Sequence, residues 1–181
     1  TAAVRKITAA PLHIDDESSL TIDSIRARGR RMVREHGVKC IGVDYLQLVR
    51  STTQQARGSR EREVSEISAG LKALAKELKV PVIVLAQLNR GPESRTGASL
   101  GVPRISDLRE SGSIEQDADV VLFLYRAAYY NSQNGETEQA NENEAECIVA
   151  KNRHGETSVV RLGWDGAHTR FSNLDEIHEQ Y

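Results

Sequence analysis

The sequence has few residues of the kinds that define disulfide-rich or membrane proteins. Among 181 residues there are two cysteines, four prolines and 4% aromatic residues. The two cysteines, Cys40 and Cys147, lie in apolar runs without metal-site spacing, which favours neither a disulfide framework nor a zinc site. The longest apolar runs, VPVIVLA and VVLFLY, are far shorter than the roughly 20 residues of a membrane-spanning helix. We therefore expect a protein of the reducing cytoplasm with no membrane partner.

The sequence also has no excess of one charge. Its net charge of -2 at pH 7 excludes a simple polycationic nucleic-acid binder but leaves room for local basic loops. The length and the hydrophobic content of 39% suit one sizeable α/β domain. The N-terminus, TAAVRKITAAPLHIDD, has neither an initiator Met nor a cleavable signal pattern, so we expect a fragment of a longer protein.

Apolar spacing predicts alternating helices and strands. One helix should begin after Thr21, which can cap it, and end at Gly37, and a second should run from Glu61 to Lys79. The expected strands are 12–16, 39–45, 80–86 and 120–125. The continuous Val, Ile and Leu content of 80–86 predicts that both faces of that strand are buried, as in a parallel sheet covered by helices.

Two segments lack apolar periodicity. Residues 89–112 are rich in glycine and arginine, and a loop this long inside a compact domain is usually functional or mobile. Residues 131–146 are polar and acidic, which predicts a solvated excursion. After them, ECIVAKNR and TSVVRLGW flank His154 and Gly155, a pattern that predicts a C-terminal β-hairpin.

Polar side chains follow three of the expected strands. Asp44 follows CIGV, Gln87 follows VPVIVLA, and Lys151 and Arg153 follow ECIVA. Ligands of open parallel sheets bind beyond the carboxyl ends of the strands, so we expect all four side chains at one edge. There a carboxylate can bind Mg²⁺ through water, an amide can bond a phosphate oxygen or an attacking water, and cations can neutralise a phosphoryl group in transfer.

Each of these residues also has an ordinary structural interpretation. An aspartate after a strand is a common turn or cap residue, and a single glutamine carries no more information. The commoner interpretation of Lys151 and Arg153 is solvated charge on an edge strand. The arginines of the first helix, Arg26, Arg30 and Arg34, are typical of a soluble surface.

The segments VDYLQLV, VPVIVLAQLNR, SDLRESGSIEQDADVVLFLYR and AKNRHG, in this order, resemble the C-terminal motor domain of the DnaB-type bacterial replicative helicase. The resemblance covers nearly all of residues 12–174. It implies an α/β fold with a RecA-like, mostly parallel sheet flanked by helices and a C-terminal β-hairpin, truncated on its N-terminal side. Residues 1–181 would then be the distal part of a single domain. The implied activity is that of a homohexameric, ATP-driven helicase that moves 5′ to 3′ on single-stranded DNA and unwinds duplex at the replication fork.

The resemblance assigns roles to the strand-end residues. Asp44 matches the Walker B carboxylate that supports Mg²⁺ and ATP, and Gln87 matches a phosphate-sensing glutamine. Lys151 and Arg153 match a basic pair that acts across the subunit interface, with an arginine finger reaching the neighbour's ATP. Gln47 belongs to the family signature, but the resemblance gives it no separate role.

The segment DLRESGS matches the part of the family that contacts the backbone of single-stranded DNA, and this assigns Arg109, Glu110 and Gly112. An arginine supplies charge and a glycine lets backbone N–H groups approach phosphate, so the assignment is plausible for two of the three. Glu110 is the least expected, because a carboxylate would face an anion. The ordinary interpretation is a mobile glycine-bearing loop that Ser113 caps ahead of a short helix.

The phosphate-loop pattern G-x-x-x-x-G-K-[ST] does not occur in the sequence. In the family this loop and the catalytic glutamate lie upstream, so we expect the isolated chain to hydrolyse little or no ATP. Primase and a helicase loader would bind through parts of the protein outside this chain. We expect the protein to lie in the cytoplasm, associated with the nucleoid. Two alternatives are another RecA-like ATPase of recombination or repair and a degenerate, non-catalytic interaction module.

Overall fold

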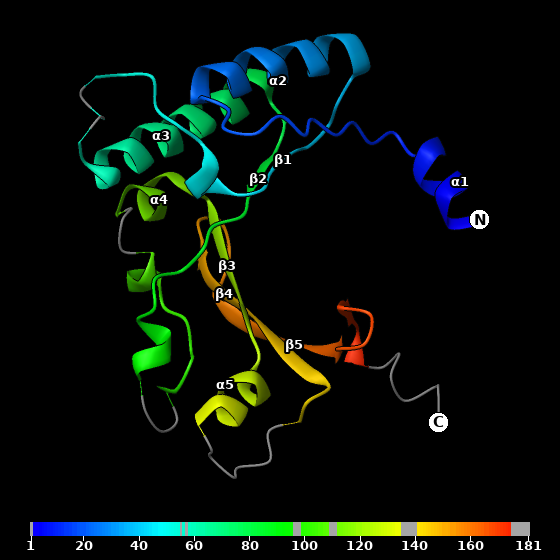
Figure 1. The fold of residues 1–181 in the computed structure, drawn as a ribbon, viewed down its shortest axis with the longest axis vertical. Coiled ribbons are helices and arrows are strands. Elements are labelled where there is room, and N and C mark those ends of the chain that lie inside the picture. Colours follow the sequence, from blue (N-terminus) through cyan, green and yellow to red (C-terminus); the bar gives the residue numbers. More distant parts are fainter. Residues whose placement is uncertain are drawn as a thin grey trace.

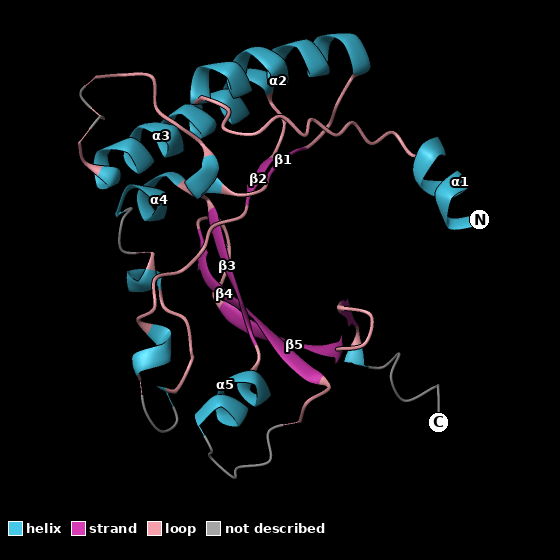
Figure 2. Ribbon diagram, in the orientation of Figure 1, coloured by secondary structure: helices cyan, strands magenta, loops and turns pink. Residues whose placement is uncertain are grey.

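The computed structural model describes residues 2–54, 56, 58–95, 99–108, 112–134 and 141–174. Its helices are α1 (Ala2–Ala9), α2 (Ile22–His36), α3 (Arg60–Leu78), α4 (Gly112–Asp117) and α5 (Ala127–Asn134). Its strands are β1 (Ile41–Val43), β2 (Val82–Val84), β3 (Val120–Tyr125), β4 (Glu144–Asn152), β5 (Ser158–Asp165) and β6 (Arg170–Ser172). Helices α2 and α3 lie together at one end, and the long strands extend away from them (Figures 1 and 2). None of the helices in the described ranges is long and apolar enough to cross a bilayer.

Helix α2 has the ends that its sequence predicts. The Thr21 hydroxyl accepts a hydrogen bond from the Ser24 N–H at 3.2 Å, which satisfies one free donor of the first turn. Gly37 ends the helix in the left-handed region at a φ of 64°, where its N–H donates to the Val33 carbonyl. A residue with a Cβ adopts this conformation at a cost, so the glycine terminates α2 here.

The larger core lies between α2, α3 and the strands β1 and β2. It buries apolar residues of α2, of η1 (Leu46–Leu48) and the residue that follows it, and of α3, namely Ile22, Ile25, Leu46, Val49, Val64, Ile67, Leu71 and Leu74. The predicted helical spacing of α3 is therefore confirmed. Gly70 permits the close approach of α2 to α3, because a Cβ at that position would lie 2.5 Å from Cγ1 of Ile22.

The described strands form two sheets. Strands β1 and β2 pair in parallel, with Ile41 opposite Val82 and Val43 opposite Val84. Strands β3, β4, β5 and β6 form an antiparallel sheet in that order. The predicted hairpin is confirmed, because β4 and β5 pair around the turn that contains His154 and Gly155.

Two predictions about strands are wrong. Residues 12–16 pair with no strand in the described part of the chain; instead Asp15 forms an ion pair with Arg28 of α2. Within the described part of the chain, strand β2 is covered on one face only. Val82 and Val84 pack against the core, whereas the side chain of Ile83 is 58% exposed. Apolar content alone predicted two covering layers, but the described elements supply one.

Strand β3 also has one buried and one exposed face. Val121 and Phe123 form a second core with Leu108, and Phe123 is 5% exposed. The alternate residues Leu122 and Leu124 lie on the opposite face of the strand and are 56% and 61% exposed. The strand is apolar throughout, yet only alternate residues are packed.

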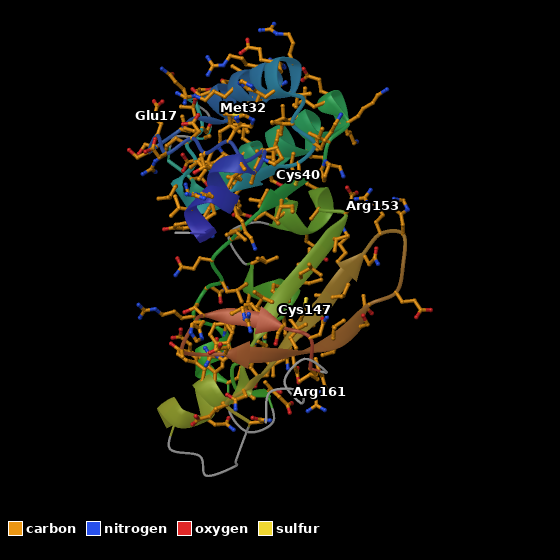
Figure 3. All side chains as sticks on the ribbon, turned by 90° about the vertical axis from the view of Figure 1, so that its right-hand side faces the viewer. Glu17, Met32, Cys40, Cys147, Arg153 and Arg161 are labelled. Atoms are coloured by element: carbon orange, nitrogen blue, oxygen red, sulfur yellow. The ribbon has the colours of Figure 1, made fainter. Side chains whose placement is uncertain are left out.

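The two cysteines are both free. Cys40 precedes β1 and is exposed, and Cys147 lies half-buried in β4 (Figure 3).

Because one face of β3 is buried and the other exposed, shortening a side chain to alanine should destabilise the fold more on the buried face. Phe123→Ala should lower the free energy of unfolding of the chain by about 3–5 kcal/mol, because it leaves a cavity in the second core. Leu124→Ala, its matched neighbour, should cost less than about 1 kcal/mol. Urea unfolding followed by circular dichroism measures both. An equally large loss in Leu124→Ala would show that the exposed face is covered in solution.

Candidate functional site

Asp44 and Gln87 follow the two parallel strands at their carboxyl ends. Val43 and Val84 are register partners, and the hydrogen bonds continue past the strands. The Leu85 N–H donates to the Val43 carbonyl at 3.0 Å, and the Leu46 N–H donates to the Leu85 carbonyl at 2.8 Å. The predicted proximity of Asp44 and Gln87 at one sheet edge is thus confirmed.

Gln47 joins these two segments through its side chain. Its Nε2 donates to the carbonyl of Gln87 at 2.9 Å, and its Oε1 accepts a hydrogen bond from the Gln87 N–H at 3.2 Å. This reciprocal pair fixes the backbone from which the Gln87 side chain extends. Sequence reasoning missed the role, although an amide within an otherwise apolar run was the available signal.

The backbone of Gln47 is itself fastened to α3. Arg60 Nη2 donates to the Gln47 carbonyl at 2.9 Å, and the guanidinium also pairs with Glu63. Glu63 in turn accepts a hydrogen bond from the Ser51 N–H. Burial acts to raise the pKa of Glu63, but the Ser51 N–H and Arg60 outweigh it and lower the pKa below its ordinary value. The segment after β1 is therefore tied to α3 through charged hydrogen bonds.

A shallow pocket of about 370 Å³ opens beside these strand ends, lined by Tyr45, Leu85, Ala86 and Gln87. Asp44 adjoins it and is exposed, and its carboxylate has no hydrogen-bond partner among the residues the structure describes. Within those residues no three or more acidic, histidine or cysteine side chains are placed together so that they could hold a metal ion. A lone, unpaired carboxylate suits a Mg²⁺ ion that keeps most of its water shell, so the residues present fit that ion.

The basic pair does not join Asp44 and Gln87. Strand β4 runs antiparallel to β3, so its carboxyl end lies beside the first residue of β3, with Asn152 opposite Val120. Among the described residues no hydrogen bond or ion pair links Lys151 or Arg153 to the other group. Figure 3 shows Arg153 at the end of the hairpin nearer to the helices. The prediction that all four side chains share one edge is wrong, because the carboxyl-edge rule holds for parallel strands only.

The DNA-contact prediction falls partly on residues that the structure leaves undescribed. Arg109 and Glu110 lie outside the described residues. Gly112 is described: it is exposed and is the first residue of α4. A Cβ at Gly112 would meet no atom within 4 Å, so its backbone is open to an approaching group.

The segment that leads from Gln87 toward Gly112 contains the short helices η2 (Pro92–Ser94) and η4 (Ile105–Asp107). Asp107 is its central polar contact and is 4% exposed. Its carboxylate accepts hydrogen bonds from both terminal nitrogens of Arg95, at 2.5 and 3.0 Å, and from the Arg104 N–H at 2.7 Å. The described parts of the predicted loop, 89–95 and 99–108, are therefore joined by an ion pair between buried Asp107 and half-buried Arg95. Burial acts to raise the pKa of Asp107, but the Arg95 and Arg104 hydrogen bonds outweigh it and lower the pKa.

Two of the three named arginines of α2, Arg30 and Arg34, are exposed as predicted, whereas Arg26 is half-buried. Arg30 forms two hydrogen bonds with the carboxylate of Glu77 on α3, and Arg26 lies 3.9 Å from the same carboxylate. Arg34 pairs with Glu35. The contacts of all three are surface ion pairs, which contribute little to stability.

A sequence profile described as the DnaB-like helicase C terminal domain matches residues 1–173. The chain belongs to this family. A replicative DNA helicase DnaB of Leifsonia xyli subsp. xyli (strain CTCB07) is 49% identical over 177 residues, which are 97% of this chain and 36% of that protein. The chain thus spans well under half the length of this relative.

Two solved structures are also similar. One is a DnaB-like replicative helicase described with its interactions with primase; the TM-score is 0.85 at 37% identity, over 96% of this chain and 40% of that one. The other is described as an ATPase domain, with a TM-score of 0.86 at 37% identity, over 96% of this chain and 58% of that one. The predicted RecA-like class of this DnaB-like chain is therefore confirmed.

Removing the Gln47 side-chain hydrogen bonds from this DnaB-like chain should cause a measurable loss of stability. Gln47→Ala should lower the free energy of unfolding by about 1–2 kcal/mol, because each of the two hydrogen bonds contributes about 1 kcal/mol net. Gln54→Ala is the matched control, since Gln54 is exposed, and it should change stability by less than about 0.5 kcal/mol. Equal urea midpoints for the two variants would contradict the role of Gln47.

The Asp107 ion pair predicts a pH-dependent effect. Since the pKa of Asp107 is lowered from 3.8, its carboxylate stabilises the fold above that pH and loses this effect as the pH falls through the folded-state pKa. Asp107→Asn should cost about 3–5 kcal/mol at pH 7, because the half-buried guanidinium of Arg95 loses the carboxylate that pairs with it. The difference from wild type should shrink below pH 3.8.

Urea unfolding from pH 2 to pH 7 measures the Asp107 effect. The control is Asp16→Asn, at an exposed carboxylate, which should stay within about 0.5 kcal/mol of wild type. A cost of Asp107→Asn that is equal at all pH values would contradict the assignment.

Proposed function

We propose that this chain is the distal part of the RecA-like motor domain of an ATP-driven replicative DNA helicase. The observation that carries the proposal is the family match over residues 1–173. The exposed apolar side chains of β2 and β3, Ile83, Leu122 and Leu124, support the assignment to part of a domain, because the remainder could cover them. In this proposal the phosphate loop and the catalytic glutamate lie upstream, so residues 1–181 alone hydrolyse little or no ATP.

The parallel-strand edge is the proposed nucleotide end of the domain. Asp44 would hold Mg²⁺ through water, and the Gln87 amide would sense the terminal phosphate of ATP. A bound Mg²⁺ would supply positive charge that offsets charge on the phosphates during transfer. The exposed carboxylate of Asp44 and the fastened backbone of Gln87 support this arrangement.

Lys151 and Arg153 are the proposed trans-acting pair. Their separation from Asp44 and Gln87 supports a role at a second ATP site, on the neighbouring subunit of a homohexamer. An arginine finger there stabilises charge in the transition state and can raise turnover by about 10³ or more. Hydrolysis would therefore require assembly of the ring.

The segment that contains Arg109, Glu110 and Gly112 is the proposed contact with single-stranded DNA. Backbone contacts carry affinity without sequence readout, which suits a motor that moves over any sequence. The motor would move 5′ to 3′ and unwind duplex at the fork. Primase and a loader would bind other parts of the full protein, in the cytoplasm at the nucleoid; the similar structure described with primase supports a primase partner.

The proposal predicts a strict requirement for Arg153. In the full-length protein that contains these residues, single-stranded DNA should stimulate ATP hydrolysis, and Arg153→Ala should lower turnover by about 10³-fold while ATP binding and hexamer mass are kept. Arg161→Ala is the matched control, because Arg161 lies on the same hairpin and pairs with Glu144 instead (Figure 3). It should retain near wild-type turnover.

Other outcomes distinguish the alternatives. DNA-independent hydrolysis that tolerates Arg153→Ala would point to a different RecA-like ATPase, and a strand-exchange assay would then test for recombination. Failure of the full-length protein to bind ATP would favour a non-catalytic interaction module. Turnover by residues 1–181 alone, above background, would contradict the placement of the phosphate loop.

A further inference from the structure

The basic pair of the hairpin binds the carboxyl end of α4. Lys151 Nζ donates to the Glu115 carbonyl, and Arg153 Nη2 donates to the Gln116 carbonyl at 2.9 Å. The last carbonyls of a helix have no partner within the helix, and cations near that end are favoured by the helix dipole. Both side chains thus use the same short helix as their support.

Asp119 completes this support between α4 and β3. Its carbonyl accepts a hydrogen bond from the Arg153 N–H at 2.8 Å, and its carboxylate lies 3.2 Å from Arg153 Nε. The other carboxylate oxygen accepts a hydrogen bond from Lys72 Nζ of α3 at 2.5 Å. Lys72, and with it Arg153, lowers the pKa of Asp119. The carboxylate is therefore charged at neutral pH and is anchored to α3.

The contacts of Arg153 leave one side of its guanidinium free. Nε and Nη2 are engaged by Asp119 and the Gln116 carbonyl, whereas Nη1 has no partner among the residues that the structure describes. Arginine presents its five N–H donors in a planar fork, so two engaged nitrogens fix the direction of the third. The side chain is 46% exposed, and Nη1 can therefore reach a group on another molecule.

We infer that Asp119 is the positioning residue of the trans-acting arginine: it aims the free Nη1 of Arg153 outward, toward a phosphate oxygen on the neighbouring subunit. This rests on the proposed function of Arg153. Asp119 touches no nucleotide itself and acts through the guanidinium. Lys72 holds the carboxylate in place, and the Gln116 carbonyl provides the second contact.

The same geometry connects the basic pair to the proposed DNA contact. Helix α4 begins at Gly112 and ends at Asp117, whose carboxylate accepts a hydrogen bond from the Ser68 hydroxyl of α3 at 2.7 Å. A displacement of α4 would therefore move the carbonyls that hold Lys151 and Arg153. The proposed DNA contact and the support of Arg153 thus lie on the same helix.

The test measures ATP turnover by the assembled full-length protein with single-stranded DNA. Asp119→Asn should lower kcat by about fivefold, with KM for ATP nearly unchanged, because an exposed ion pair of up to about 1 kcal/mol biases the guanidinium by that factor. Asp119→Glu should recover part of the loss. Glu77→Gln is the matched control and should leave kcat unchanged, since it removes an exposed carboxylate of α3 that pairs with Arg30 of α2 and not with Arg153.

A second background separates positioning from general structural damage. In Arg153→Lys the Nε and Nη2 contacts are absent, so adding Asp119→Asn should lower kcat no further. If Asp119→Asn lowered kcat by the same factor in the wild type and in Arg153→Lys, the inference about Asp119 would be overturned. It would also be overturned if Asp119→Asn left kcat unchanged while Arg153→Ala strongly lowered turnover. In either case the proposed role of Arg153 would stand. Full turnover by Arg153→Ala would instead overturn the proposed trans-acting role, and the inference with it. Hexamer mass and circular dichroism confirm that each variant is folded and assembled.

Discussion

The parallel pairing of β1 with β2 is the contact on which the candidate site depends. It aligns Val43 with Val84, so the two chain segments that leave the strands emerge side by side. Helices α2 and α3 bury the facing sides of both strands in one core, and the near contact between Gly70 and Ile22 brings the helices close enough to do so. Asp44 and Gln87 are neighbours only because this pairing places them at the same edge.

Polar contacts fasten the segments that lack apolar packing. The amide of Gln47 fixes the chain at Gln87, the Asp107 carboxylate fixes the segment between Gln87 and α4, and the carboxylate of Asp119 fixes the hairpin end at Arg153. A polar side chain that bonds two or more groups at once favours a single arrangement of the backbone where hydrophobic contacts are few. The three contacts lie in order along the chain between the proposed nucleotide end and the proposed trans-acting pair.

The two faces of the strands have different environments. Phe123 is packed in the second core, whereas Leu122 and Leu124 are more than half exposed on the opposite face of the same strand. A protein that exposes an apolar sheet face of this kind usually covers it with another element or partner. The family match to a domain of much longer relatives is consistent with a covering segment outside this chain.

The sequence alone determined the two long helices, α2 and α3, and the hairpin, because these depend on local features: the cap at Thr21, the stop at Gly37, the helical spacing of 61–79 and alternation around His154 and Gly155. It also identified the RecA-like class through its motifs. Only the tertiary structure decided that strand 80–86 is covered on one face, and that the basic pair lies apart from Asp44. Burial depends on which layers surround a strand, and an edge position depends on strand direction, so neither is encoded in the residues of the strand itself.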